Sequence, residues 1–357
     1  MVNLDDKKAV LKIQGGDVVL KSIDAFPSQC QESWEKSQQV HFPSNYKNFD
    51  SIVVCGMGGS RFPTLIIKEL FKEDLVVPLL INDNYDLPGF VDKNTLVILS
   101  SYSGTTEEVI ICGKKALSRG AKITGITSGG DIASFLKTNK MPAYIFDPVN
   151  NPSGQPRIGV GYAVGGQLGM LVKIGAIKTD KTMIDQAIKN FPSLIQNFKI
   201  NVPLSSNQAK QLALQLYQKY PYYVVAEFLT GIGNAIANQT NETAKSISSF
   251  RVIPELNHHL MEGLKFPDLH QKMAVFIFFF SKLYSFPIQK RFHITADVVK
   301  QNKISTIWHE LKGKNKIEQA FELMSLGNYL TMYLSTLYKQ DPSVIPYVDY
   351  FKKKLKE

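Results

Sequence analysis

The chain of 357 residues is 44% hydrophobic and 20% charged, which provides the cores of about two ordinary domains and excludes a disordered or fibrous protein. Its net charge of +10 comes mainly from scattered lysines, and no stretch interleaves aromatic and basic residues as nucleic-acid binders do. The three cysteines lack metal-ligand spacing, the N-terminus has no signal-peptide pattern, and the longest apolar run, Met273–Phe280, is too short to span a bilayer. We therefore expect a soluble cytoplasmic protein without nucleic-acid or membrane partners.

The first part of the chain predicts a helical lead-in followed by alternating strands and helices. Residues 1–48 are polar and helical in pattern, with Trp34 and Phe42 as the expected docking residues. Runs rich in β-forming residues then alternate with helical stretches at the spacing of β-α-β units, at residues 51–55, 75–82, 95–100, 122–127 and 143–146. Such units form a parallel sheet with helices on both faces.

The second part of the chain repeats this pattern. A helix over 207–219 precedes a strand at 222–227 and a long helix through Glu242, and further strands are expected at 251–253, 273–280 and 304–308. Residues 165–194 are expected to contain the long helix that joins the halves, and a last helix over 316–340 ends before Pro342.

The predicted fold class is therefore α/β, with two doubly wound parallel-sheet domains. The expected organisation is a helical N-terminal extension (1–48), a first domain (49–195), a second domain (196–340) and a C-terminal tail (341–357).

A glycine turn at 55–61 (CGMGGSR) follows the first predicted strand and raises the possibility of a dinucleotide site. Gly56 and Gly58 match the first two glycines of that fingerprint, and Asp83 near the end of the next strand offers a ribose-binding acid. The third glycine, which allows close packing of helix and strand, is replaced by Arg61. We therefore do not favour a nicotinamide cofactor.

A second turn, residues 99–108 (LSSYSGTTEE), is rich in hydroxyl groups and follows the strand predicted at 95–100. A capping box of Thr105 and Glu108 would account for one or two of these hydroxyls. The remaining candidates, together with the first glycine turn, offer hydroxyls and free amides at two neighbouring strand ends, where open α/β sheets bind ligands. The sequence thus predicts a phosphate site formed by Gly59, Ser60, Ser101, Ser103 and Thr106.

Four stretches in order are similar to motifs of a known family. The turns 56–60 (GMGGS) and 101–108 (SYSGTTEE) resemble those of the sugar isomerase (SIS) domain, a phosphosugar-binding module. Two further resemblances are to segments of the bifunctional phosphoglucose/phosphomannose isomerases. They are carried by the stretch 151–165 (NPSGQPRIGVGYAVG) and by 238–245 (NQTNETAK) together with 252–263 (VIPELNHHLMEG). The resemblance runs from about residue 49 to the C-terminus.

This resemblance implies two SIS domains in a homodimer that takes part in glycolysis and gluconeogenesis. The implied reaction interconverts glucose 6-phosphate, and also mannose 6-phosphate, with fructose 6-phosphate, with no metal or organic cofactor. Moving a carbonyl from C1 to C2 needs a base that shuttles a proton between the two carbons, an acid–base pair that opens the ring, and a cation beside the enediolate.

The resemblance assigns these tasks to particular residues. Glu242 matches the carbon base, although a glutamate on a polar helix is usually only solvated. His258 matches the ring-opening histidine, which in this family reaches the neighbouring subunit's active site; His259 stands where the family has asparagine and remains a rival. Arg157 matches the cation beside the enediolate, with a surface charge as the ordinary alternative.

Lys352 matches a C-terminal lysine that takes part in ring opening, which implies that the tail 341–357 returns to the active site. The neighbouring Lys353 is the rival, and a run of lysines is commonly a solvated helix end. The chain departs from the family at 235–238 (AIAN), where basic and aromatic residues are usual, and in the basic segment 282–314.

Two other functions remain open from the sequence. A non-catalytic SIS protein that senses a phosphosugar would need the hydroxyl loops but not Glu242, His258 and Arg157 together. Another SIS enzyme, such as the isomerase half of an amidotransferase, is the other option, and the lack of an N-terminal domain with a cysteine nucleophile counts against a complete enzyme of that type. The preference between glucose and mannose 6-phosphate depends on room around C2 and C3, for which the small side chain of Ser343 is a candidate.

Overall fold

The computed structural model describes residues 2–355 and 357, and the chain divides into two compact units. The first unit is residues 25–190, and the second unit combines residues 1–24 with 191–357. Within the expected N-terminal extension, helices α1 (Lys7–Leu11) and α2 (Gly16–Asp24) thus belong to the second unit, and α3 (Phe26–Ser37) belongs to the first. The domain boundaries expected at residues 48, 195 and 340 stay a prediction.

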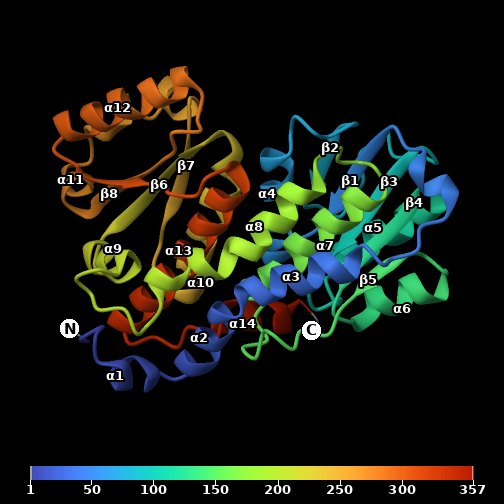
Figure 1. Ribbon diagram of the computed structural model, residues 1–357, viewed down its shortest axis with the longest axis horizontal. Helices are drawn as coiled ribbons and strands as arrows, with labels where there is room; N and C mark the ends of the chain where they lie inside the picture. Colours follow the sequence, from blue (N-terminus) through green and yellow to red (C-terminus); the bar gives the residue numbers. More distant parts are fainter. Residues whose placement is uncertain (1, 356) are drawn as a thin grey trace. The chain divides into compact units, whose positions relative to one another are not determined.

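The first unit contains a five-stranded parallel sheet in the order β2-β1-β3-β4-β5 (Figure 1). In chain order its elements are α3 (Phe26–Ser37), β1 (Ser51–Cys55), α4 (Phe62–Leu70), β2 (Leu79–Asn82), β3 (Thr95–Ser100), α5 (Glu107–Ser118), β4 (Lys122–Thr127), α6 (Gly130–Thr138), β5 (Ala143–Ile145), α7 (Val160–Lys173) and α8 (Lys181–Leu194), which contains the unit boundary. The strand order reverses between β1 and β3, so the loops after these two strands form the crevice where such sheets bind ligands.

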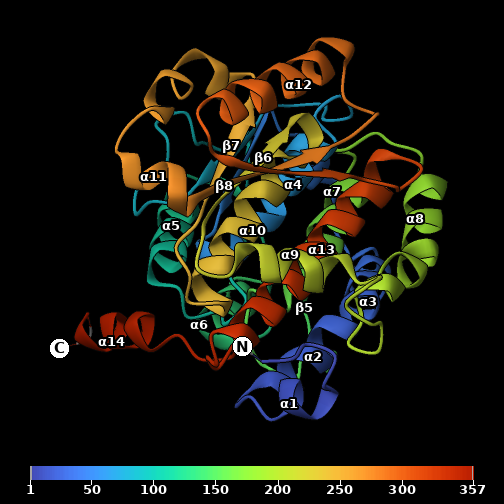
Figure 2. The ribbon, with the colours of Figure 1, turned by 90° about the vertical axis from the view of Figure 1, so that its left-hand side faces the viewer.

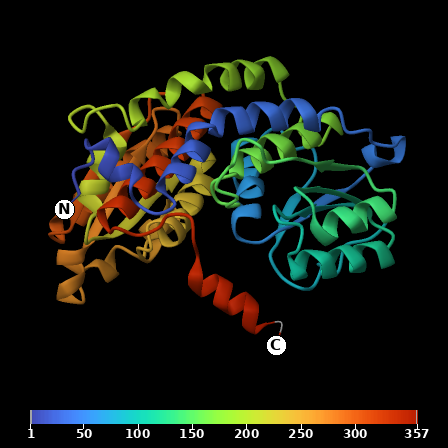
Figure 3. The ribbon, with the colours of Figure 1, turned by 90° about the horizontal axis from the view of Figure 1, so that it is seen from below.

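Helices cover both faces of this sheet, as the buried strands require (Figure 3). One face packs Val53, Cys55, Val97 and Leu99 against α5 and α6. A second cluster joins Tyr144, Phe146 and Ile126 to α7, with Phe42 packed against it. Trp34 on α3 is buried and donates its Nε1 proton to Asp185 at 2.7 Å, so both residues expected to dock the lead-in do so.

The second unit contains a four-stranded parallel sheet in the order β7-β6-β8-β9. Its elements are α1 (Lys7–Leu11), α2 (Gly16–Asp24), α9 (Gln208–Leu216), β6 (Tyr220–Ala226), α10 (Thr230–Thr243), β7 (Ser249–Ile253), α11 (Asp268–Met273), β8 (Ala274–Phe280), α12 (Phe286–Gln301), β9 (Ser305–Glu310), α13 (Lys316–Leu337) and α14 (Pro346–Lys354). Figure 2 shows α10 and α13 on one side of this sheet and α12 on the other.

The predicted α/β class with two parallel sheets is confirmed, and the differences from the predicted elements have local causes. The strand expected over 75–82 is confined to β2, because Pro78 cannot donate to a sheet ladder. The region 165–194 contains, as expected, the helix that joins the halves: α8 carries the unit boundary, and the earlier part of the region belongs to α7, which ends before Gly175 adopts a φ of +80°. Among the described residues, no helix is both long and apolar enough to cross a membrane.

Helices α3 and α7 approach closely along three glycines of α7 spaced four residues apart, Gly161, Gly165 and Gly169. A Cβ atom on Gly165 would lie 2.5 Å from the carbonyl oxygen of Cys30 and 3.0 Å from the backbone nitrogen of Trp34. Because both of these atoms belong to the backbone of α3, a side chain at this position forces the helices apart.

We expect Gly165→Ala to lower the free energy of unfolding by about 1–3 kcal/mol, the usual cost of overpacking. Chemical denaturation measures this change. Gly89→Ala is the matched control, since a Cβ at Gly89 meets nothing within 4 Å. Equal stability of the two variants would show that α3 and α7 do not depend on this contact.

Candidate active site

Two loops meet at the carboxyl edge of the first sheet, after β1 and after β3. These strands are direct neighbours, with Cys55 opposite Leu99. The amide of Tyr102 donates to Ser60 Oγ at 2.9 Å, and Ser100 Oγ donates to the carbonyl oxygen of Ser60 at 2.9 Å. The structure therefore brings the glycine turn and the hydroxyl-rich turn into contact, as expected for one binding site.

The hydroxyl groups of the second loop are organised in pairs. Ser101 Oγ lies 2.7 Å from Thr106 Oγ1 and also accepts the amide proton of Gly104. Ser103 Oγ lies 3.1 Å from Thr105 Oγ1 and accepts the amide proton of Thr105. A hydrogen bond between two hydroxyls uses one of their two protons, so each pair retains a donor for an anion.

The capping box predicted from Thr105 and Glu108 is wrong. Helix α5 begins at Glu107, its N-cap is Thr106, and the Thr106 side chain makes no capping hydrogen bond because it is engaged by Ser101. The first amides of α5 therefore keep their donors at the positive end of the helix dipole. This arrangement suits a phosphoryl group better than the predicted box does.

Arg157 lies directly beside the glycine turn. A Cβ atom on Gly59 would lie 3.2 Å from the Arg157 backbone nitrogen, so the turn and the arginine loop touch where Gly59 has no side chain. Arg157 is only 1% exposed, which is inconsistent with an ordinary surface charge, and its Nη1 donates to Gln155 Oε1 at 2.8 Å. The predicted cation thus belongs to the same region of the first unit as the phosphate loops.

Asn151 braces the arginine loop and was missed by the sequence reasoning. Its Nδ2 donates to the Tyr102 hydroxyl at 2.7 Å and to the carbonyl oxygen of Gln155 at 3.1 Å, and its Oδ1 accepts from Ser153 at 2.6 Å. Burial raises the pKa of Tyr102 to about 12, so this phenol stays neutral. The only signal in the sequence was the position of Asn151 at the start of the stretch 151–165.

Glu242 lies in the second unit, in the last turn of α10, and is partly exposed. Lys245, which follows with a φ of +55°, donates its Nζ proton to the Glu242 carbonyl oxygen at 2.7 Å and closes the helix end. Asn241 Oδ1 accepts the amide proton of Ser248 at 3.0 Å and fixes the chain that leads into β7.

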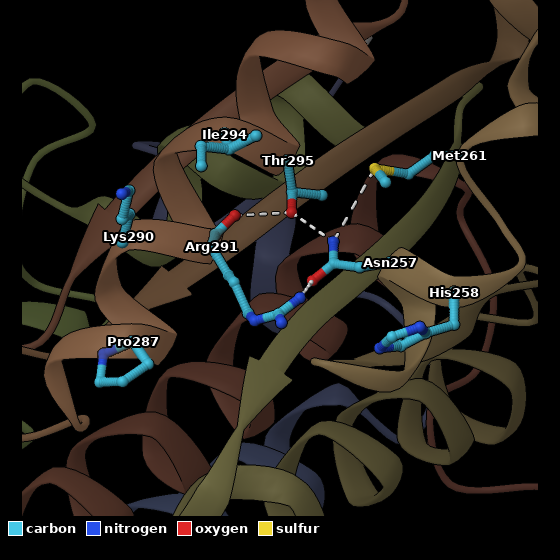
Figure 4. Close-up of a pocket in the computed structure, with 8 residues that line it drawn as sticks. All are labelled: Asn257, His258, Met261, Pro287, Lys290, Arg291, Ile294 and Thr295. Carbon is cyan, nitrogen blue, oxygen red and sulfur yellow. Dashed lines mark hydrogen bonds between the residues drawn. The ribbon is translucent and has the colours of Figure 1, made fainter.

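His258 ends the short 3-10 helix η5 (Glu255–His258), which follows β7. It lines a pocket of about 460 Å³ together with side chains of α12, among them Lys290 and Arg291 (Figure 4). The rival His259 lies outside this pocket lining and approaches the Glu255 carboxylate at 4.0 Å. The structure thus places only His258 against the pocket, and its catalytic role stays a prediction.

Glu242 and His258 of one chain lie at opposite edges of the second sheet. Helix α10 returns from the carboxyl end of β6 to the amino end of β7, so Glu242, near its end, lies at the amino edge. His258 follows the carboxyl end of β7, a strand of five residues that spans about 16 Å. Two side chains at opposite edges cannot act on adjacent atoms of one small substrate.

Lys352 lies on α14, which has no buried residues, and both Lys352 and Lys353 are exposed. The structure therefore does not separate these two candidates. Ser343 precedes α14, and its amide and hydroxyl both donate to Asp341 Oδ1, at 2.7 and 2.6 Å.

No cluster of three or more His, Cys, Asp or Glu side chains suited to a metal occurs among the described residues. Asp83, the candidate ribose ligand of the dinucleotide alternative, accepts a hydrogen bond from Arg61 Nε at 2.8 Å.

Two parallel sheets covered by helices define an α/β protein, and its second part matches a SIS domain. Residues 205–355 match the family described as bacterial phospho-glucose isomerase C-terminal SIS domain. Two solved structures share this fold. A hypothetical protein from Thermus thermophilus has a TM-score of 0.75 and 13% identity, and the match covers 99% of this chain and 93% of that one. The C-terminal domain of glucosamine-fructose-6-phosphate aminotransferase from Francisella tularensis has a TM-score of 0.72 and 12% identity, and the match covers 91% of this chain and 97% of that one.

Curated relatives cover nearly the whole chain. A bifunctional phosphoglucose/phosphomannose isomerase from Caldicellulosiruptor bescii is 32% identical over 350 residues, covering 95% of this chain and 99% of the relative. A protein of the same name from Aquifex aeolicus is 27% identical, and the match covers 95% of this chain and 98% of the relative. The chain belongs to the bifunctional phosphoglucose/phosphomannose isomerase family.

We expect Ser101→Ala to weaken the binding of a phosphorylated sugar by about tenfold, because it removes one hydroxyl of the pair predicted to bind the phosphoryl group. Isothermal titration calorimetry with fructose 6-phosphate measures this affinity. Ser118→Ala is the matched control, since Ser118 lies at the other end of α5 and its hydroxyl donates only to a carbonyl of its own helix. Unchanged affinity in Ser101→Ala would remove this loop from the site.

Proposed function

We propose that the protein is an aldose–ketose isomerase that interconverts glucose 6-phosphate, and also mannose 6-phosphate, with fructose 6-phosphate. Its relatives of 27% and 32% identity carry both isomerase activities in their names and match 95% of the chain. The contact of the two hydroxyl-bearing loops with the Arg157 segment is the main structural support. In this role the enzyme would act in cytoplasmic glycolysis and gluconeogenesis.

In the proposed reaction, the first unit holds the phosphoryl end of the sugar. The donors are the hydroxyls of Ser60, Ser101, Ser103 and Thr106, with amides of Gly59 and of the start of α5. Neutral donors suit this task because they bind the anion in a fixed geometry without long flexible chains.

Glu242 takes a proton from C2 of the open aldose and returns it to C1, through a cis-enediolate. A carboxylate serves both steps because it is neutral after the first and charged again after the second. The guanidinium of Arg157 stabilises the negative charge that develops on the enediolate oxygen. Its burial strengthens this effect, because a charge in a dry site is poorly screened.

His258 and Lys352 are assigned to ring opening, in which one group protonates the ring oxygen while another accepts the proton of the anomeric hydroxyl. We propose that His258 serves the active site of a second copy in a homodimer. The placement of Glu242 and His258 at opposite edges of one sheet supports this sharing, because a single chain cannot bring both to the same sugar.

We expect Glu242→Gln to lower the isomerisation rate by at least a thousandfold, since amide replaces the proton-shuttling carboxylate. Proton NMR in D₂O, which follows exchange of the C2 proton of glucose 6-phosphate, measures the same step. Binding of fructose 6-phosphate should stay within a few-fold of wild type. Wild-type turnover in this variant would rule Glu242 out as the base, whereas binding without turnover in the wild type would indicate a non-catalytic phosphosugar sensor.

A complementation experiment tests the shared site. Glu242→Gln and His258→Ala homodimers should each be almost inactive, but co-expressed subunits should recover about a quarter of wild-type activity, because half of the dimers are mixed and each has one intact site. His259→Ala, mixed in the same way with Glu242→Gln, is the control for the neighbouring histidine and should be active by itself. Absence of recovery in the first mixture would contradict a contribution across the interface.

A further inference from the structure

We infer that Thr295 and Asn257 are positioning residues for His258, which hold its imidazole in place for ring opening. This inference rests on the proposed function, because it explains how that function is supported by residues outside the assigned catalytic set. Thr295 lies in 282–314, the basic stretch that departs from the family pattern, and Asn257 directly precedes His258.

The short helix η5 is anchored on one side and open on the other. Leu256 is 2% exposed and anchors η5 in the core. Asn257 and His258 both line the pocket, and of the two it is Asn257 that is hydrogen-bonded to α12. Figure 4 shows Asn257 between His258 and the side chains of α12. A turn this short is not stable by itself, so its anchors decide where His258 lies.

Asn257 is held at both ends of its side-chain amide. Its Nδ2 donates to Thr295 Oγ1 at 2.7 Å, and its Oδ1 accepts from Arg291 Nη1 at 3.4 Å. Thr295 donates its own hydroxyl proton to the carbonyl oxygen of Arg291 at 2.6 Å. Since that proton is used, the hydroxyl can only accept from Asn257, which fixes the direction of the amide.

The network is anchored on a buried residue, whereas the histidine ring is exposed. Thr295 is 1% exposed and sits in the middle of the sixteen-residue helix α12. The ring of His258 is exposed, and within the part of the chain that the structure describes it makes no hydrogen bond of its own. The position of the imidazole therefore depends on its backbone, which the bond between Asn257 and Thr295 ties to α12. A displacement of about 1 Å is enough to lower a rate a hundredfold.

The test separates ring opening from proton transfer between carbons. In the Glu242→Gln background isomerisation is stopped, but His258 can still open the ring of glucose 6-phosphate, which interconverts its α and β anomers. Exchange NMR spectroscopy measures that interconversion, with the Glu242→Gln/His258→Ala double variant giving the rate without the histidine.

Adding Thr295→Val to the Glu242→Gln background should lower the catalysed anomer interconversion about tenfold, and Thr295→Ser should restore it, because serine keeps the accepting hydroxyl. Asn257→Asp, which has the same shape but cannot donate to Thr295, should behave as Thr295→Val does. Thr336→Val is the control: Thr336 is equally buried and its hydroxyl also donates to a carbonyl four residues earlier, but on α13.

The outcomes are distinct. Interconversion within twofold of the parent in both Thr295→Val and Asn257→Asp would overturn the positioning role, as would an equal loss in Thr336→Val. Absence of isomerisation in the wild-type protein would instead overturn the proposed function, and the positioning role with it. A loss in both network variants, with recovery in Thr295→Ser, supports the inference.

Discussion

The hydrogen bond from the Tyr102 amide to Ser60 Oγ joins the two loops on which the rest of the candidate site depends. It can form because β1 and β3 are parallel neighbours, so the chain leaves both strands at the same edge and on either side of the strand-order reversal. Ser100 then extends the link inward: its hydroxyl accepts from Gln167 Nε2 at 2.9 Å, and Gln167 Oε1 accepts from Thr64 at 2.8 Å. This buried series of hydrogen bonds connects the loops after β1 and β3 to α4 and α7, so the packed core restricts the positions of both loops.

The second unit repeats the topology of the first but uses the corresponding edge differently. Its strand order also reverses, between β6 and β8, where the loops would form a second anion site. Glu227 occupies that place with a φ of +44°, and its carboxylate accepts from the backbone amide and the hydroxyl of Ser285, at 3.2 and 2.6 Å, where α12 begins. The chain thus supplies its own carboxylate at this helix start.

The sequence predicted what depends on short-range pattern. The strands β1, β3 and β4 have the predicted bounds, because apolar β-branched runs between turns have few alternatives. Residues joined only by the fold could not be predicted: Asn151 and Tyr102, or Gln167 and Ser100, are far apart along the chain, and a buried glutamine looks like any other in the sequence. The capping box failed for a related reason, since Ser101 competes for the Thr106 hydroxyl only once the loop has closed. The roles of Glu242, His258, Arg157 and Lys352 stay predictions carried by family resemblance.

The division of labour in the proposed enzyme follows from β-α-β geometry. A crossover helix must return the chain from one edge of a parallel sheet to the other, so residues near the end of α10 and residues after β7 are separated by the length of a strand. A fold of this kind can place a base or an acid at a given edge, but it cannot place both on one small sugar when they come from the two ends of the same β-strand. If Glu242 and His258 both take part in the reaction, a second copy must supply one of them, and dimerisation is then a requirement of the proposed chemistry.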